Sequence, residues 1–114
     1  MEPRKWIIRF RARDKFNFDE VVEDLKKVET RAATDKYRKI TKGDILVFVC
    51  GKNRLEKKIK KVELFKTLDA MYRKINYKKI MPSQPSAAAA KRVNESYPGY
   101  KEKLKAFGVI AYYI

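Results

Sequence analysis

The first hydrophobic pattern is an alternation close to the N-terminus. Trp6, Ile8 and Phe10 share one face, and Ile7, Arg9 and Arg11 share the other. Successive side chains of a strand point to opposite faces. The pattern therefore predicts a half-buried strand whose outer face carries cations.

The next pattern has a period of three to four residues. Phe18, Val21, Val22 and Leu25 form one apolar stripe, which predicts a short amphipathic helix. Asn17 stands directly before the stripe, where its side chain is expected to cap the first turn.

The middle of the chain predicts strands separated by a basic loop. Residues 27–31 predict a short strand, and residues 34–42 predict a polar, basic loop. The continuous apolar run 45–50 predicts a central strand that is buried on both faces. Residues 55–65 predict one long strand, and a shift in its alternation near Lys60 indicates a β-bulge.

Helices and a closing strand are expected towards the C-terminus. Thr67 and Ser86 each precede a helical segment, residues 102–107 predict one or two helical turns, and 109–114 predict a strand. Strands do not alternate regularly with helices, so a doubly wound parallel sheet is not expected. The order favours a single α+β domain spanning residues 1–114, with a mostly antiparallel, partly closed sheet and flanking helices.

The charge balance points to a polyanionic partner. The 114 residues include 29 Lys and Arg against 14 Asp and Glu, a formal net charge of +15. Such a charge attracts nucleic acid, acidic proteins or anionic membranes. We expect nucleic acid, RNA rather than DNA; an acidic partner and a merely solvated surface remain alternatives.

Other features exclude some classes of protein. No apolar run approaches the roughly 20 residues of a membrane span, and no signal peptide is recognisable, so a cytoplasmic protein that does not bind membranes is expected. Cys50 is the only cysteine and should be buried, and histidine is absent. We expect no zinc site, no cofactor and a monomeric chain.

Three segments resemble one known family. The hexapeptide Lys26-Lys27-Val28-Glu29-Thr30-Arg31 resembles the lysine-x-x-glutamate-x-arginine signature of the ASCH (activating signal cointegrator homology) family. Gly43-Asp44 before an apolar strand resembles its next block, and the stretch from Pro82 to Ala111 resembles its closing helix, turn and strand. The resemblance implies a PUA-like fold, a small mixed β-barrel with helices beside a cleft, and RNA binding. It also implies that Lys26, Glu29, Arg31 and Tyr97 lie in or near that cleft.

One branch of this family resembles an amidohydrolase that acts on N4-acetylated cytidine through a lysine, a threonine and a glutamate. Lys26 matches the lysine, but Glu29 occupies the threonine position, with Thr30 beside it. The glutamate position falls near Pro82, where there is no acidic residue. That activity is therefore not transferred, and an enzyme is less expected than a binding module. If the chain is an enzyme, Lys26, Glu29 and Thr30 are the catalytic candidates.

Three clusters are candidate nucleic-acid contacts, and each has a structural alternative. The signature residues could instead form an ion-pair network, the basic loop could be solvated with its tyrosine in the core, and the lysine-rich strand could be a protected sheet edge. The expected contacts are Lys26, Glu29, Arg31, Lys36, Tyr37, Arg38, Lys39, Lys42, Lys58, Lys60 and Tyr97. An RNA-binding module fits best; a hydrolase acting on RNA or a modified nucleoside (amidohydrolase-like or a ribonuclease), and a protein-interaction module, remain alternatives.

Overall fold

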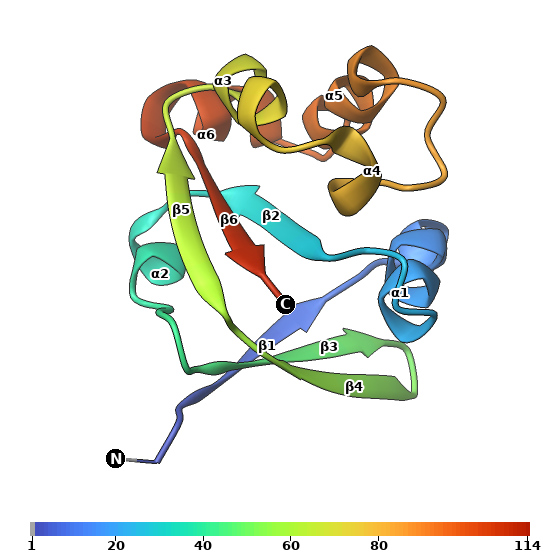
Figure 1. Cartoon of the computed structure of the whole chain (residues 1–114), viewed down its shortest axis with the longest axis vertical. Coiled ribbons are helices and arrows are strands. Elements are labelled where there is room, and N and C mark those ends of the chain that lie inside the picture. Colours follow the sequence, from blue (N-terminus) through green and yellow to red (C-terminus); the bar gives the residue numbers. More distant parts are fainter. Residues whose placement is uncertain (1) are drawn as a thin grey trace.

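Strands and helices are mixed along the chain in the computed structural model, which describes residues 2–114 (Figure 1). The six strands in this range are β1 (Lys5–Arg9), β2 (Val28–Ala32), β3 (Ile45–Cys50), β4 (Asn53–Lys58), β5 (Lys61–Phe65) and β6 (Val109–Tyr113). The helices are α1 (Lys15–Val22), α2 (Asp35–Arg38), α3 (Leu68–Lys74), α4 (Tyr77–Ile80), α5 (Ala87–Glu95) and α6 (Tyr100–Phe107), with a 3-10 turn η1 (Ala12–Asp14). The predicted α+β class is confirmed.

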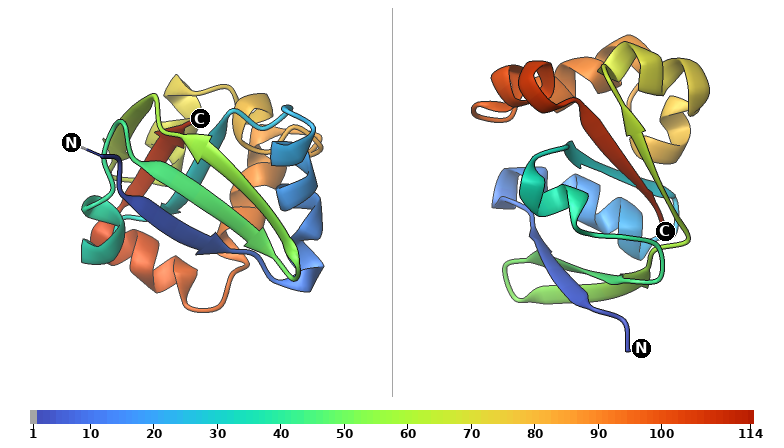
Figure 2. Two further views of the ribbon diagram at one scale, coloured as in Figure 1. Left: turned by 90° about the horizontal axis from the view of Figure 1, so that it is seen from below. Right: turned by 90° about the vertical axis from the view of Figure 1, so that its left-hand side faces the viewer.

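The strands form two three-stranded sheets. The first sheet has the order β1-β3-β4, with β1 parallel to β3 and β4 antiparallel to it. The second sheet has the order β2-β6-β5 and is antiparallel throughout. Helices α3, α4, α5 and α6 gather on the side of the second sheet that faces away from the first (Figures 1 and 2).

The chain crosses from one sheet to the other between β4 and β5. At this point the Ile59 N–H donates to the Asp44 carbonyl at 2.9 Å, and the Lys60 N–H donates to the Tyr113 carbonyl at 2.7 Å. The prediction of one long bulged strand was therefore wrong in its extent, although the irregularity lies where it was expected. The bend buries Ile59, which is 1% exposed, and it carries the following strand into a different sheet.

The larger hydrophobic core lies between the two sheets. Inward-facing residues of the first sheet, such as Ile8 and Phe48, pack in one cluster with Ile110 and Tyr112 of the second sheet. The predicted burial of Cys50 is confirmed, and this thiol belongs to the same cluster. A second cluster joins the other face of the second sheet to helices α3, α4 and α5, and it contains Val28, Met71, Ile80, Ala90 and Val109.

The first helix differs from its prediction. Asn17 lies inside α1 instead of capping it, and Asp14 occupies the N-cap position. Val22 and Leu25 are 54% and 53% exposed, so only half of the predicted apolar stripe is buried. The helix ends at Val22, and Asp24 adopts a left-handed backbone conformation with φ of 60°, so the helical period stops before it reaches Leu25.

The predicted cap at Thr67 is confirmed, and Ser86, where a helix was predicted to start, is also a cap. The Thr67 hydroxyl accepts a hydrogen bond from the Ala70 N–H at 3.0 Å, and the Ser86 hydroxyl accepts one from the Ala89 N–H at 3.1 Å. These contacts satisfy N–H groups that the first turn of a helix leaves without a backbone partner. Short polar residues at these positions thus fix where α3 and α5 begin.

One expected loop and one expected helix differ from their predictions. The basic loop 34–42 contains the single turn of α2, and α6 begins at Tyr100, two residues before the predicted start. Within residues 2–114, no helix has both the length and the apolar character that a membrane span requires.

Candidate nucleic-acid interface

A cleft of about 210 Å³ opens where the end of β1 meets η1, β2, α2 and the turn before α6. It is called the cleft below. Nine residues line it: Arg9, Phe10, Arg11, Asp14, Arg31, Tyr37, Tyr97, Pro98 and Tyr100. Segments from both ends of the chain therefore build one hollow, whose lining combines arginines with aromatic rings.

The aromatic rings of the cleft are held by neighbouring polar groups. Tyr97 and Tyr100 meet edge to face with ring centroids 5.4 Å apart, and the Asn17 amide donates to the Tyr97 hydroxyl oxygen at 3.0 Å. The Arg11 guanidinium lies 5.1 Å from the centroid of the Tyr97 ring. These contacts restrain the tyrosine rings before any ligand arrives, which lowers the entropy cost of stacking a planar ligand there.

The three arginines of the cleft differ in how far they are already paired. Arg9 makes no salt bridge or side-chain hydrogen bond within residues 2–114, whereas Arg11 pairs with Asp14 at 2.6 Å. Arg31 pairs with the buried Glu29 at 3.0 Å, and its guanidinium carbon lies 5.2 Å from the centroid of the Phe10 ring. Since the lining holds three arginines and one aspartate, its formal charge is +2.

Charged residues continue beneath the cleft as a buried network around Glu29. One carboxylate oxygen of Glu29, Oε1, accepts from Arg31 and from the Thr30 N–H at 2.8 Å. The Lys26 ammonium lies 3.9 Å from the same oxygen and donates to the Ile80 carbonyl. Lys26 and Glu29 are each 2% exposed, so neither side chain is open to a ligand. The other oxygen, Glu29 Oε2, is buried and has no hydrogen-bond partner within residues 2–114.

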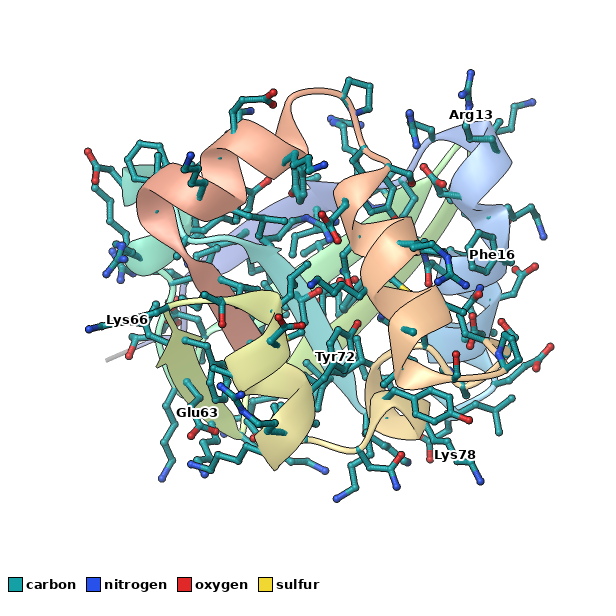
Figure 3. The ribbon with its side chains drawn as sticks, turned by 90° about the horizontal axis from the view of Figure 1, so that it is seen from above. Arg13, Phe16, Glu63, Lys66, Tyr72 and Lys78 are labelled. Carbon is teal, nitrogen blue, oxygen red and sulfur yellow. The ribbon has the colours of Figure 1, made fainter. Side chains whose placement is uncertain are left out.

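The buried network reaches α3 and α5 through neutral polar groups. The side-chain amide nitrogen of Asn94 donates to the Thr30 hydroxyl at 3.4 Å, and the Tyr72 hydroxyl donates to the side-chain oxygen of Asn94, Oδ1, at 2.5 Å. Figure 3 places Tyr72 between α3 and α5. Glu20 of α1 is also buried and accepts from the N–H and hydroxyl of Ser83, each at 3.2 Å. These bonds tie α1 and the helices above the second sheet to β2 and to the segment before α5.

Burial and charge shift the pKa values of these groups. Burial lowers the pKa of the Lys26 ammonium, although the nearby Glu29 carboxylate opposes this shift. Burial also disfavours the charged form of Arg31, but Glu29 together with Tyr100, Tyr37 and Tyr97 outweighs this effect, and the pKa of Arg31 is raised. Burial, together with the charges of Glu29 and Asp14, raises the pKa of Tyr97 to about 12. The Tyr97 hydroxyl therefore stays neutral at physiological pH.

The predicted contact residues divide between the cleft and other places. Arg31, Tyr37 and Tyr97 line the cleft, as the RNA-binding hypothesis requires. Glu29 lies beneath it, and Lys26 is buried behind Glu29 in an ion-pair network, which was the structural alternative for these two residues.

The remaining residues of the basic loop 34–42 do not line the cleft. The Lys36 ammonium lies 5.3 Å from the centroid of the Tyr37 ring. Arg38 donates to the Ala33 carbonyl at 2.7 Å and to the Phe107 carbonyl at 2.9 Å, so it holds α2 against the start of β6. Lys39 is exposed.

Three of the predicted lysines lie elsewhere. Lys42 and Lys58 line a separate hollow of about 520 Å³ together with Arg4, and Lys60 is exposed at the crossing between β4 and β5. Strands β4 and β5 are the edges of their sheets, and this agrees with the alternative of a lysine-protected edge.

Several cleft residues were not predicted as sites. Arg9 and Arg11 carry the cationic alternation of the first strand, so their pattern was visible, but nothing local indicated that the strand ends in a cleft. Phe10 alternates with them and lines the cleft although it was assigned to the core face. Asp14 and Tyr100 carry no local signal, because each reaches the cleft only through the packing of η1 and α6.

Comparisons with known proteins identify fold relatives only. No family model matches the chain, and no curated protein does. The crystal structure of a hypothetical protein named PH0355 is similar over 96% of this chain and 95% of its own, with a TM-score of 0.79 and 26% identity. The solution structure of protein PF0455 from Pyrococcus furiosus covers 96% of this chain and 94% of its own, with a TM-score of 0.69 and 24% identity. The chain therefore shares its whole fold with these two proteins, whose names state no activity.

Proposed function

We propose that this protein is an RNA-binding module that holds a single-stranded segment in the cleft. The observation that carries the proposal is the convergence of three arginines and several aromatic rings on one hollow of about 210 Å³. Proteins that bind single strands combine cations that follow the phosphates with aromatic side chains on which bases stack. Tyr97 and Tyr100 offer ring faces, and Arg9 offers a guanidinium that has no partner within residues 2–114.

The family resemblance supports the same proposal. We propose that the two sheets form a PUA-like barrel, because the chain passes directly from β4 into β5 and because one core cluster contains inward-facing residues of both sheets. The ASCH-like signature lies on β2, where Arg31 lines the cleft and Glu29 lies beneath it. The preference for RNA over DNA, and the membership of the family, rest on this resemblance.

The buried carboxylate suggests which part of a nucleotide enters deepest. Glu29 Oε2 is an acceptor without a partner within residues 2–114, next to an arginine of the cleft lining. The negative charge of this carboxylate disfavours a phosphate on the side of the cleft above it, although its 2% exposure keeps a ligand from bonding to it directly. We therefore propose that a base lies over Arg31, on the side of the cleft nearest Glu29, while a phosphate contacts Arg9.

Binding is proposed in preference to catalysis because of the position of Lys26. Its ammonium donates to the Ile80 carbonyl, the side chain is 2% exposed, and it does not line the cleft. A nucleophile or general base must reach the reacting atom to within hydrogen-bond distance. The arrangement around Lys26 thus favours a structural ion pair over a catalytic one.

The experiment that tests this proposal compares three nucleic acids by fluorescence anisotropy over a salt series. The probes are a single-stranded RNA, an RNA hairpin and a DNA duplex. For a single strand, each neutralised phosphate contributes about −0.7 to the slope of log affinity against log salt. We expect the single-stranded RNA to bind most tightly and Arg9→Ala to reduce its slope by about 0.7.

The variant Tyr97→Leu tests the stacking part of the proposal. Loss of one stacked base weakens binding by about 1–3 kcal/mol, and this loss should be insensitive to salt. A suitable control is Tyr77→Leu, because Tyr77 lies on α4 and does not line the cleft. If single-stranded RNA fails to bind at 150 mM salt, or if both tyrosine variants bind like the wild type, the proposal is wrong.

A further inference from the structure

The outer face of the first sheet is open to solvent. Inward-facing residues of β1 and β3, such as Ile8 and Phe48, belong to the core between the sheets. The alternate residues face outwards, and the view from below shows β1, β3 and β4 in front with no helix across them (Figure 2). This face is therefore a surface about three strands wide, or about 10 Å between its outer strands.

The strand register lines up two arginines across this face. Arg9 of β1 is paired with Val49 of β3, and Val49 is paired with Arg54 of β4. Paired residues of neighbouring strands point to the same face, so the two arginines stand on either side of one valine. Val49 itself is only 9% exposed, so the two arginines are the exposed members of this row of three residues.

These two arginines, Arg9 and Arg54, have no ion-pair or hydrogen-bond partner for their side chains within residues 2–114. The acidic residue that faces outwards on β4, Glu56, is held by Lys5 at 3.2 Å. The row of Arg9, Val49 and Arg54 therefore presents two guanidinium groups, and the outward-facing carboxylate of β4 is already paired.

The row begins at the cleft, because Arg9 belongs to both. We infer that the outer face of the first sheet carries the RNA backbone that leaves the cleft, with Arg9 and Arg54 contacting successive parts of the same strand. This inference rests on the proposed function. Two guanidinium groups on strands about 10 Å apart do not share one phosphate, so Arg54 contacts nucleotides outside the cleft.

The test uses RNAs of two lengths on the full chain. A trinucleotide is expected to fill the cleft without reaching Arg54, whereas an RNA of about 12 nucleotides crosses the sheet. For Arg54→Ala, we expect the salt slope of the longer RNA to become shallower by about 0.7. If the variant and the wild type bind equally at 1 M salt, the variant should then bind roughly fivefold more weakly than the wild type at 0.1 M salt. Trinucleotide binding, followed by NMR, should be unchanged.

Two further variants control for net charge and for folding. Lys105→Ala removes one positive charge from the far end of α6, where Lys105 lines a different hollow, and should leave both RNAs unaffected. Glu56→Ala removes the paired carboxylate and should strengthen binding of the longer RNA only. Circular dichroism checks that each variant is folded.

The outcomes separate this inference from the proposed function. If the wild type binds the longer RNA but Arg54→Ala behaves like Lys105→Ala, the backbone takes another path and only this inference fails. The same holds if Arg54→Ala weakens both lengths equally, since its effect is then not confined to the flank. If the wild type binds neither RNA, the proposed function fails and this inference fails with it.

Discussion

The cleft and the buried network lie on either side of Arg31, and both place cations close to carboxylates. In the network, Lys26 and Arg31 share the Glu29 carboxylate, and Lys26 and Glu29 are both 2% exposed. In the cleft, Arg9 is exposed and has no charged partner within residues 2–114. The same residue types are thus fixed in one region and available for binding in the other.

The difference lies in solvation. A buried ion is costly unless it is paired and hydrogen-bonded, so Lys26, Glu29 and Arg31 constrain one another and hold β2 in place. An exposed guanidinium remains solvated and contributes little to folding, so it is free to exchange water for a phosphate. A basic residue is therefore a candidate for phosphate binding only where the fold leaves it unpaired.

Removal of the shared carboxylate should give the largest effect. Glu29→Ala leaves Lys26 and Arg31 buried without their counter-charge, and we expect a loss of about 3–5 kcal/mol in the free energy of unfolding. Urea denaturation measures this loss. In the matched control Glu56→Ala, an exposed pair with Lys5 is broken, at a cost of at most about 1 kcal/mol. Equal effects in the two variants would show that the network is not a buried ion-pair system.

The neutral end of the network should contribute less. Tyr72→Phe leaves the side-chain oxygen of Asn94, Oδ1, without its hydroxyl donor, and we expect a loss of about 1–3 kcal/mol in the free energy of unfolding. Tyr77→Phe removes an exposed hydroxyl that donates to the Pro85 carbonyl, and should cost less than about 1 kcal/mol. Thermal and urea unfolding of both variants would rank them, and the reverse order would contradict this assignment.

Arg9 should show the opposite behaviour to Glu29. Since its side chain has no partner within residues 2–114, Arg9→Ala should change the free energy of unfolding by no more than about 0.5 kcal/mol. The same variant is the one expected to reduce the salt dependence of RNA binding. Urea denaturation and anisotropy on one preparation test both statements. A large loss of stability would show that Arg9 belongs to the scaffold.

Alkaline pH should lower the free energy of unfolding through tyrosines whose pKa is raised. The pKa of Tyr97 is raised to about 12, above its ordinary value of 10.0, so the unfolded chain loses this proton before the native protein does. The contribution of Tyr97 to the free energy of unfolding is therefore fully present below pH 10 and should be lost as the pH rises from 10 to 12. Tyr113, whose pKa burial and Glu63 also raise to about 12, adds to this slope. Tyr97→Phe should make the fall shallower in a series of urea denaturations, and an unchanged slope would contradict the assignment.

Local patterns predicted much of the secondary structure. The run Ile45–Cys50, the alternation before Phe10, and the caps at Thr67 and Ser86 each report on interactions within a few residues. These interactions are set by the period of burial and by the N–H groups at helix starts. The exposed Val22 and Leu25 show the limit of such patterns, because the length of α1 is set by the turn at Asp24 and by packing.

The sequence by itself determined the α+β class, the positions of most strands and the excess of positive charge. Only the tertiary structure decided which cations are free. Lys26 and Arg9 look equivalent in the sequence, but the first is buried and donates to the last residue of α4, and the second lines the cleft. The reason is physical: pairing and desolvation depend on residues that are distant in the chain, such as Ile80 for Lys26 and Tyr97 for the cleft, and no local pattern encodes those contacts.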